Sequence, residues 1–204
     1  MLFRSALARR RTPALLMVLF ALYSLMFFAL FSFLPILLTA RLGVSSQSAG
    51  GLSALAAAAN VVGNLAAGNL LARGVSRPLL IAVAALVMGA SALGIFLPLL
   101  GGWGAFFLCL LFSATGGLIP ATLLATAPAA AGSAAMVPVM MGLLMTGSNF
   151  GQVTGPIAVG SVVSAWGWGA ASVMVVAAAI LAGLAAWLLA RGAHNGASET
   201  RDPA

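Results

Sequence analysis

The sequence has almost no acidic residues and no lysine. Its only acidic residues are Glu199 and Asp202, its only histidine is His194, and all nine basic residues are arginine. Residues 13–190 therefore contain no Asp, Glu, Lys or His. Nucleophilic catalysis needs an activating group beside the nucleophile, and a metal site needs ligands. We therefore expect no enzyme activity, no metal site and no cofactor.

Cysteine and charge are also scarce. A single cysteine, Cys109, excludes an intrachain disulfide. Only 5% of the residues are charged, against about 25% in a soluble domain, while 63% are hydrophobic and the mean hydropathy is +1.17. These values predict an all-α integral membrane protein, because the apolar runs are too long for the strands of a barrel. The arginines lie at the ends of those runs, so the net charge of +7 does not indicate a nucleic-acid partner.

Six apolar runs are each long enough to cross a bilayer as a helix. We expect Pro13 in the first turn of the first helix, which is too long to be the core of a cleaved signal. Before it lies a basic N-terminal segment, residues 1–12, and after the last run lies a polar, disordered tail, residues 191–204. The predicted spans are 13–38, 48–71, 79–100, 103–125, 134–163 and 168–190.

The arginines predict the orientation of these spans. With both termini in the cytoplasm, only Arg41 lies on the outer side. Trp103, Trp166 and Trp168 then fall at the outer interface, where tryptophan is enriched. We expect a multi-pass protein of the cell membrane, specifically of the bacterial cytoplasmic membrane. The arginines on the inner side are Arg4, Arg9, Arg10, Arg11, Arg73, Arg77, Arg191 and Arg201.

The stretch 136–164, which makes up most of the fifth run, combines three features. Gly147, Gly151 and Gly155 recur every fourth residue and form a smooth stripe, against which another helix can pack closely. Two polar residues three positions apart share one face near the middle of the run. A proline directly after the last glycine should bend the second half of the helix. The polar pair is Asn149 and Gln152, and the proline is Pro156.

Polar side chains at mid-depth occur on spans one, two, four and five, and are nearly absent from spans three and six. We expect the four polar spans to line a solute path and the other two to face mainly lipid. The alternative is that these groups form interhelical hydrogen bonds, worth about 0.6–2 kcal/mol each. The candidate path residues are Tyr23, Asn60, Asn64, Thr115, Asn149 and Gln152.

The sequence also contains traces of an internal repeat. Pro35 and Pro120 are 85 residues apart and follow similar Leu-Phe-Ser segments. Ala59, Gly63 and Ala67 of span two precede the glycine stripe of span five by 88 residues. Three spans reverse the direction of the chain, so such a repeat would be inverted.

The segment GNLLARGVSR, residues 68–77, contains Gly68, Arg73 and Arg77, with Ala72 directly before the first arginine. In this segment the chain resembles the major facilitator superfamily, and specifically the C-terminal six-span half of one of its transporters. The family's cytoplasmic loop motif has a glycine and two arginines at the same positions, and Ala72 replaces the motif's acid. The segment GQVTGPIAVG, residues 151–160, resembles the family's bent Gly-Pro helices. The layout of polar and apolar spans is also similar.

The resemblance implies a six-helix half bundle with a 3+3 inverted repeat, which moves a small solute by alternating access. It further implies a second six-span bundle, either a separate N-terminal half or a second copy in a homodimer, beside the lipid bilayer and the solute. The alternative is a non-transporting accessory subunit that packs against a partner through its glycine stripes. With no ionisable group inside a span, the chain has no evident proton carrier of its own.

Overall fold

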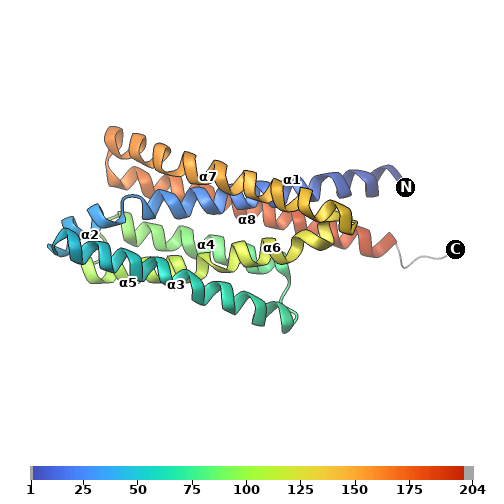
Figure 1. The fold of residues 1–204 in the computed structure, drawn as a ribbon. Coiled ribbons are helices and arrows are strands. Elements are labelled where there is room, and N and C mark those ends of the chain that lie inside the picture. The colour runs from blue at the N-terminus through green and yellow to red at the C-terminus, as the bar shows by residue number, and fades with distance from the viewer. Residues whose placement is uncertain (1, 200–204) are drawn as a thin grey trace.

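A computed structural model describes the backbone of residues 2–199 and the side chains of residues 12–192. This part of the chain is helical throughout, with short links (Figure 1). The helices are α1 (Leu2–Phe31), α2 (Leu34–Leu42), α3 (Ser46–Ala72), α4 (Arg77–Phe96), α5 (Gly102–Gly116), α6 (Leu118–Ala131), the short 3-10 helix η1 (Ala134–Met136), α7 (Val137–Trp166) and α8 (Trp168–Glu199).

The structure confirms the expectation of six long apolar helices that could cross a membrane. The second is the whole of α3, the third is α4, and the fourth joins α5 to α6. All six lie close to the predicted runs. Their bounds are Thr12–Phe31, Ser46–Ala72, Arg77–Phe96, Gly102–Ala131, Ala134–Trp166 and Trp168–Gly192.

Two of the predicted spans are broken by proline. We expected 13–38 and 103–125 to be single helices, but α1 ends at Phe31 and α5 ends at Gly116. Each end lies four residues before a proline, Pro35 or Pro120, whose ring clashes with the carbonyl four positions back and which offers no N–H. The two breaks are therefore 85 residues apart, as the prolines are. In contrast, α7 runs through Pro156 without ending.

Both ends of the chain are more helical than expected. Pro13 does not begin the first helix but lies inside α1, whose backbone is helical from Leu2. The helix α8 continues to Glu199, so the predicted disordered tail is helical over residues 191–199. This segment contains two glycines, which disfavour a helix, but it contains no proline, which would stop one. The side chains of 1–11 and 193–204 lie outside the described residues, as do the backbones of Met1 and 200–204.

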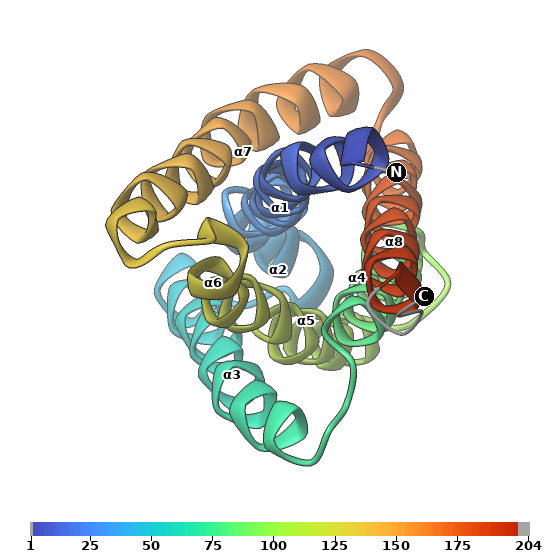
Figure 2. The same cartoon turned by 90° about the vertical axis from the view of Figure 1, so that its right-hand side faces the viewer.

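The view along the bundle shows which helices lie on which side (Figure 2). Helices α3 and α7 stand at the two edges of one face with α6 between them, while α4 and α8 pack together on the opposite side. The chain termini and the α3–α4 link lie at one end of the bundle, and the α2–α3, α4–α5 and α7–α8 links lie at the other (Figure 1). Arg73, Arg77 and Arg191 are thus at one end, and Arg41 is at the other.

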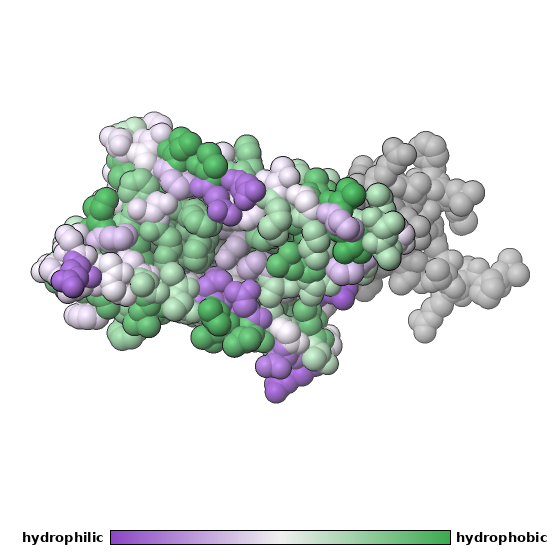
Figure 3. Space-filling view, in the orientation of Figure 1, coloured by the Kyte–Doolittle hydropathy of each residue, from purple (hydrophilic) through white to green (hydrophobic). Residues whose placement is uncertain are grey.

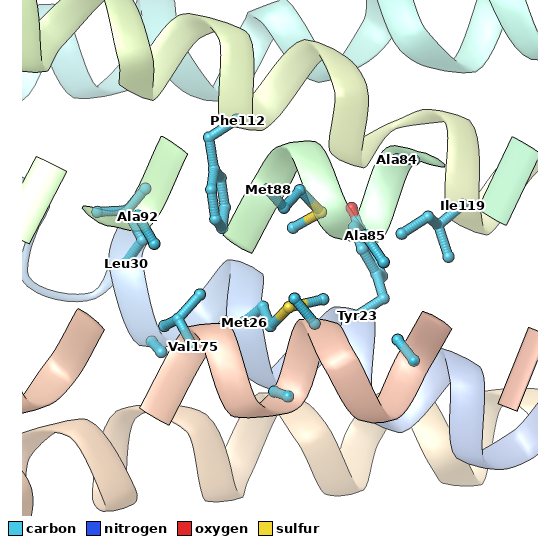
Figure 4. Close-up of a cluster of buried hydrophobic side chains, with 14 of the residues drawn as sticks. Tyr23, Met26, Leu30, Ala84, Ala85, Met88, Ala92, Phe112, Ile119 and Val175 are labelled. Atoms are coloured by element: carbon cyan, nitrogen blue, oxygen red, sulfur yellow. The ribbon is translucent and has the colours of Figure 1, made fainter. Parts of the chain in front are cut away.

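The main core lies between α1, α4, α5 and α8 (Figure 4). Met26, Met88 and Phe112 are completely buried there. Span three, α4, has the largest buried share of the six spans, which differs from the expectation that it faces mainly lipid. Its many alanines let neighbours pack closely on several sides. Only a stripe through Leu79, Val83 and Leu86 faces outward, and α8 has a similar outer stripe.

Candidate functional site

Three of the six candidate path residues meet at the middle of the bundle. The side-chain amide of Asn60, in α3, donates to the Tyr23 hydroxyl of α1 at 3.2 Å and to the backbone carbonyl of Ser113 in α5 at 3.0 Å. One turn along α3, the amide nitrogen of Asn64 donates to the side-chain oxygen of Asn60 at 2.8 Å. We call Tyr23, Asn60 and Asn64 the amide cluster; it connects α1, α3 and α5.

The amide cluster lies at the edge of the core. Tyr23 is only 7% exposed, whereas the two asparagines are half-buried. Figure 4 shows the Tyr23 side chain crossing the core from α1. Its ring is 5.8 Å from that of Phe27, and Phe27 stacks on Phe31 with centroids 4.2 Å apart. A row of three aromatic rings therefore extends along α1 from the polar groups.

A second polar group lies on the other side of α1. Ser24 and Ser148, the latter in α7, are both buried and their hydroxyl oxygens are 3.0 Å apart. The Gln152 side chain, one turn along α7, donates to the Ser148 hydroxyl at 3.2 Å. We call these three residues the serine cluster. The structure thus separates Gln152 from the amide cluster and joins it to two serines that we had not placed among the candidates.

The other two candidates form no link between helices. The Thr115 hydroxyl donates to carbonyls of its own helix, at 2.7 Å to Leu111 and 3.3 Å to Phe112. Asn149 is exposed on α7, and its side chain makes no hydrogen bond within the described part of the chain. An amide without a partner at mid-span is unfavourable in lipid, so this side chain needs water, a solute or another protein.

The face of the bundle drawn in Figure 3 carries hydrophilic side chains at its middle. In that view, hydrophilic patches lie near the middle of the bundle, over α7 and over α3, with apolar surface around them. The polar residues of α7 at this depth include Thr146 and the exposed Asn149. This is the face with α3 and α7 at its edges, opposite α4 and α8.

The glycine stripe, formed by Gly147, Gly151 and Gly155, packs against α1. A Cβ atom added to each would collide with the α1 backbone, for example at 2.6 Å from the Leu25 carbonyl oxygen for Gly155. The nearest carbonyls belong in turn to Met17, Ala21 and Leu25, one turn apart. The three glycines thus face three successive carbonyls of α1, a close approach that permits Cα–H···O contacts.

A similar approach joins α3 to the fourth span. A Cβ atom on Gly63 would collide with the carbonyl of Ala114, and one on Gly117 would lie 2.9 Å from the Asn64 backbone nitrogen. Gly117 occupies the break between α5 and α6. We had singled out Gly63 from the sequence as part of the possible repeat, but we had not singled out Gly117.

The loop motif residues lie at the end of the bundle that carries the termini. Gly68 is exposed on α3 with open space where a Cβ atom would lie, Arg73 is the C-cap of α3, and Arg77 begins α4. Neither guanidinium makes an ion pair or hydrogen bond within the described residues. The turn itself depends on Gly74, whose φ of 84° suits glycine, while the Val75 N–H bonds the Leu70 carbonyl at 3.0 Å.

Arg41, at the opposite end, has a structural contact. Its guanidinium donates to the Phe96 carbonyl at 3.0 Å, which ties the end of α2 to the end of α4. Phe96 in turn stacks on Trp168, at the start of α8, with centroids 6.1 Å apart. Arg41 therefore joins the ends of two helices.

Comparison of the chain with models of known protein families and with curated proteins found no match.

Proposed function

We propose that this chain is one six-span bundle of a membrane transporter, which moves a small solute by alternating access together with a second six-span bundle. The observation that carries this proposal is the position of the polar groups. The amide cluster, Gln152 and Asn149 all lie near mid-span on α1, α3 and α7, and α3 and α7 flank a single face. A polar face at the middle of a bilayer is costly unless it adjoins water or protein.

The pattern of helix contacts supports the 3+3 inverted repeat that the resemblance to the facilitator superfamily implies. In such a repeat, spans one, two and three correspond to spans four, five and six. Span one (α1) packs on span five (α7), and correspondingly span four (α5 and α6) packs on span two (α3). Spans three (α4) and six (α8) correspond to each other and pack together. Span one also packs on span six, as span four does on span three. In addition, the amide pair of Asn60 and Asn64 and the pair of Ser148 and Gln152 are 88 residues apart, and each pair forms a bond across one helical turn.

The alternative was an accessory subunit that binds its partner through the glycine stripe. In the structure, α1 covers that stripe from Gly147 to Gly155. A partner would have to use another face, and the exposed faces of α3 and α7 carry the mid-span polar groups. The geometry therefore favours the transport proposal.

Cysteine accessibility tests the proposal. In a Cys109→Ser background, Asn149→Cys should react with a water-soluble thiol reagent in the assembled protein in membranes, because the proposed path is wet. Leu184→Cys, on the outer stripe of α8, is the matched control: it is 52% exposed, but to lipid. Equal and negligible reaction at both positions would refute a water-filled path along α7.

A further inference from the structure

The amide cluster has hydrogen-bonding capacity that the chain does not use. Both hydrogens of the Asn60 amide have acceptors, the Tyr23 hydroxyl and the Ser113 carbonyl. The Tyr23 hydroxyl accepts that bond, but no atom of the described chain accepts its own proton. The amide nitrogen of Asn64 donates to the backbone and side-chain oxygens of Asn60, and no residue that the structure describes donates to the side-chain oxygen of Asn64. One donor and one acceptor, both beside the Asn60 amide, remain open.

We propose that Tyr23 and Asn64 bind an uncharged solute through a carboxamide group. The solute carbonyl would accept from the Tyr23 hydroxyl, and its N–H would donate to the side-chain oxygen of Asn64. The half-buried rings of Phe27 and Phe31, which continue the aromatic row from Tyr23, provide an apolar surface for the rest of the solute. This inference rests on the proposed function, which brings a solute to this face.

The absence of charge around the cluster favours a neutral ligand. No Asp, Glu, Lys or His lies between residues 13 and 190, and the arginines in that stretch are at helix ends. A charged group at the middle of a bilayer costs about 2.5–3.5 kcal/mol on insertion scales. A carboxylate bound here would be repelled by the open oxygen of Asn64, and a cation would be repelled by the hydroxyl proton of Tyr23. A carboxamide matches both open groups.

The single tyrosine of the chain makes the site directly observable. The full chain, grown with 3-fluorotyrosine and placed in nanodiscs, should give one fluorine resonance, from Tyr23. Benzamide, benzoate and benzamidinium are the probes, because they share a ring and differ in charge. We expect benzamide to shift the resonance with saturation and the two ions to leave it unchanged. No shift with benzamide, or equal shifts with all three, would overturn the inference.

Two variants locate the binding. Asn64→Leu should weaken the apparent affinity for benzamide about tenfold, because a hydrogen-bonding group of the site is lost. Asn69→Leu, at an exposed asparagine nearer the end of the same helix, is the matched control and should keep the affinity. Asn64→Ala serves as a second variant where leucine prevents folding. An unchanged affinity in both Asn64 variants would place the ligand elsewhere and overturn the inference.

Uptake measurements separate this inference from the proposed function. Benzamide binding at Tyr23 without uptake of labelled benzamide by the assembled protein in proteoliposomes would refute transport and leave the binding site intact. Uptake of one of the probes without any shift of the Tyr23 resonance would support transport and refute the site.

Discussion

Tyr23 and Ser24 are adjacent in α1 but bind helices on different sides. The Tyr23 hydroxyl accepts from Asn60 of α3 at 3.2 Å, and the Ser24 hydroxyl lies 3.0 Å from that of Ser148 in α7. Helix α1 therefore holds both edges of the polar face at the same depth. Because the two bonds come from consecutive residues, a shift of α1 along its axis would disturb both.

Replacing Tyr23 with phenylalanine should destabilise the bundle by about 1–3 kcal/mol. The change removes the acceptor of one Asn60 amide hydrogen and leaves that half-buried donor without a partner. Thermal unfolding followed by circular dichroism in detergent would measure it. Ser161→Ala, which removes a hydroxyl that bonds only the Ile157 carbonyl of its own helix, is the control. If both variants unfold like the wild type, the link from Tyr23 to Asn60 contributes no stability.

The bond between Ser24 and Ser148 should give a coupling energy of about 0.6 kcal/mol, and at most about 1.7 kcal/mol, in a double-mutant cycle with alanine. Its two hydroxyls are buried, but the unfolded helices in a membrane find other partners. Reversible unfolding in mixed micelles would supply the four free energies. A coupling energy of zero would mean that the two hydroxyls do not interact in the folded bundle.

Gly151→Leu should push α7 away from α1, because even a Cβ atom there would lie 2.7 Å from the Leu25 backbone nitrogen. We expect a loss of about 1–3 kcal/mol or more in the free energy of unfolding. Gly142→Leu, at a glycine of the same helix with open space around it, should change stability by no more than about 1 kcal/mol. Equal effects in the two variants would contradict the close packing of the glycine stripe.

The predicted orientation can be checked with two exposed link positions. In a Cys109→Ser background, Gln47→Cys, at the start of α3, should react with a membrane-impermeant maleimide in intact cells. Ser76→Cys, just before α4, should react only after the membrane is opened, because its link carries Arg73 and lies at the end with the termini. The reverse pattern would place both termini outside.

The exposed polar face predicts association with a second six-span bundle, in its simplest form a two-fold homodimer with both N-termini inside. Asn149 has no partner in the described chain and needs one away from lipid. Native mass measurements of the purified chain, in detergent and in nanodiscs, would give its stoichiometry. A monomer in both media would contradict the homodimer.

The six helices could be predicted from the sequence because length and apolar content decide membrane insertion almost alone. The breaks before Pro35 and Pro120 agree with proline chemistry. The same rule would also predict a break before Pro156, where α7 continues, so proline positions alone did not locate the breaks. The buried position of α4 could not be foreseen, since its outward stripe and its inward alanines are equally apolar. A composition argument cannot tell which apolar surface meets protein and which meets lipid.

The polar residues show the same limit. The spacing of Asn60 and Asn64 predicted that they share a helix face, but not that Tyr23 would complete the cluster. Gln152 and Asn149 are three residues apart in one helix, yet the Gln152 side chain is bonded to Ser148 and the Asn149 side chain has no hydrogen-bond partner among the described residues. Such differences depend on which neighbouring helix covers each side chain, and the sequence of α7 alone does not contain that information.

The contact between the glycine stripe and α1 divides the mutational constraint unequally between two helices. On the α7 side it requires three glycines, whereas on the α1 side it uses mainly the backbone carbonyls of Met17, Ala21 and Leu25. Every residue type except proline keeps a helical carbonyl in place, so the half-buried positions 17, 21 and 25 of α1 can vary more freely than the glycines of α7. In a saturation scan, Gly147, Gly151 and Gly155 should form a row of intolerant positions opposite these three more tolerant ones.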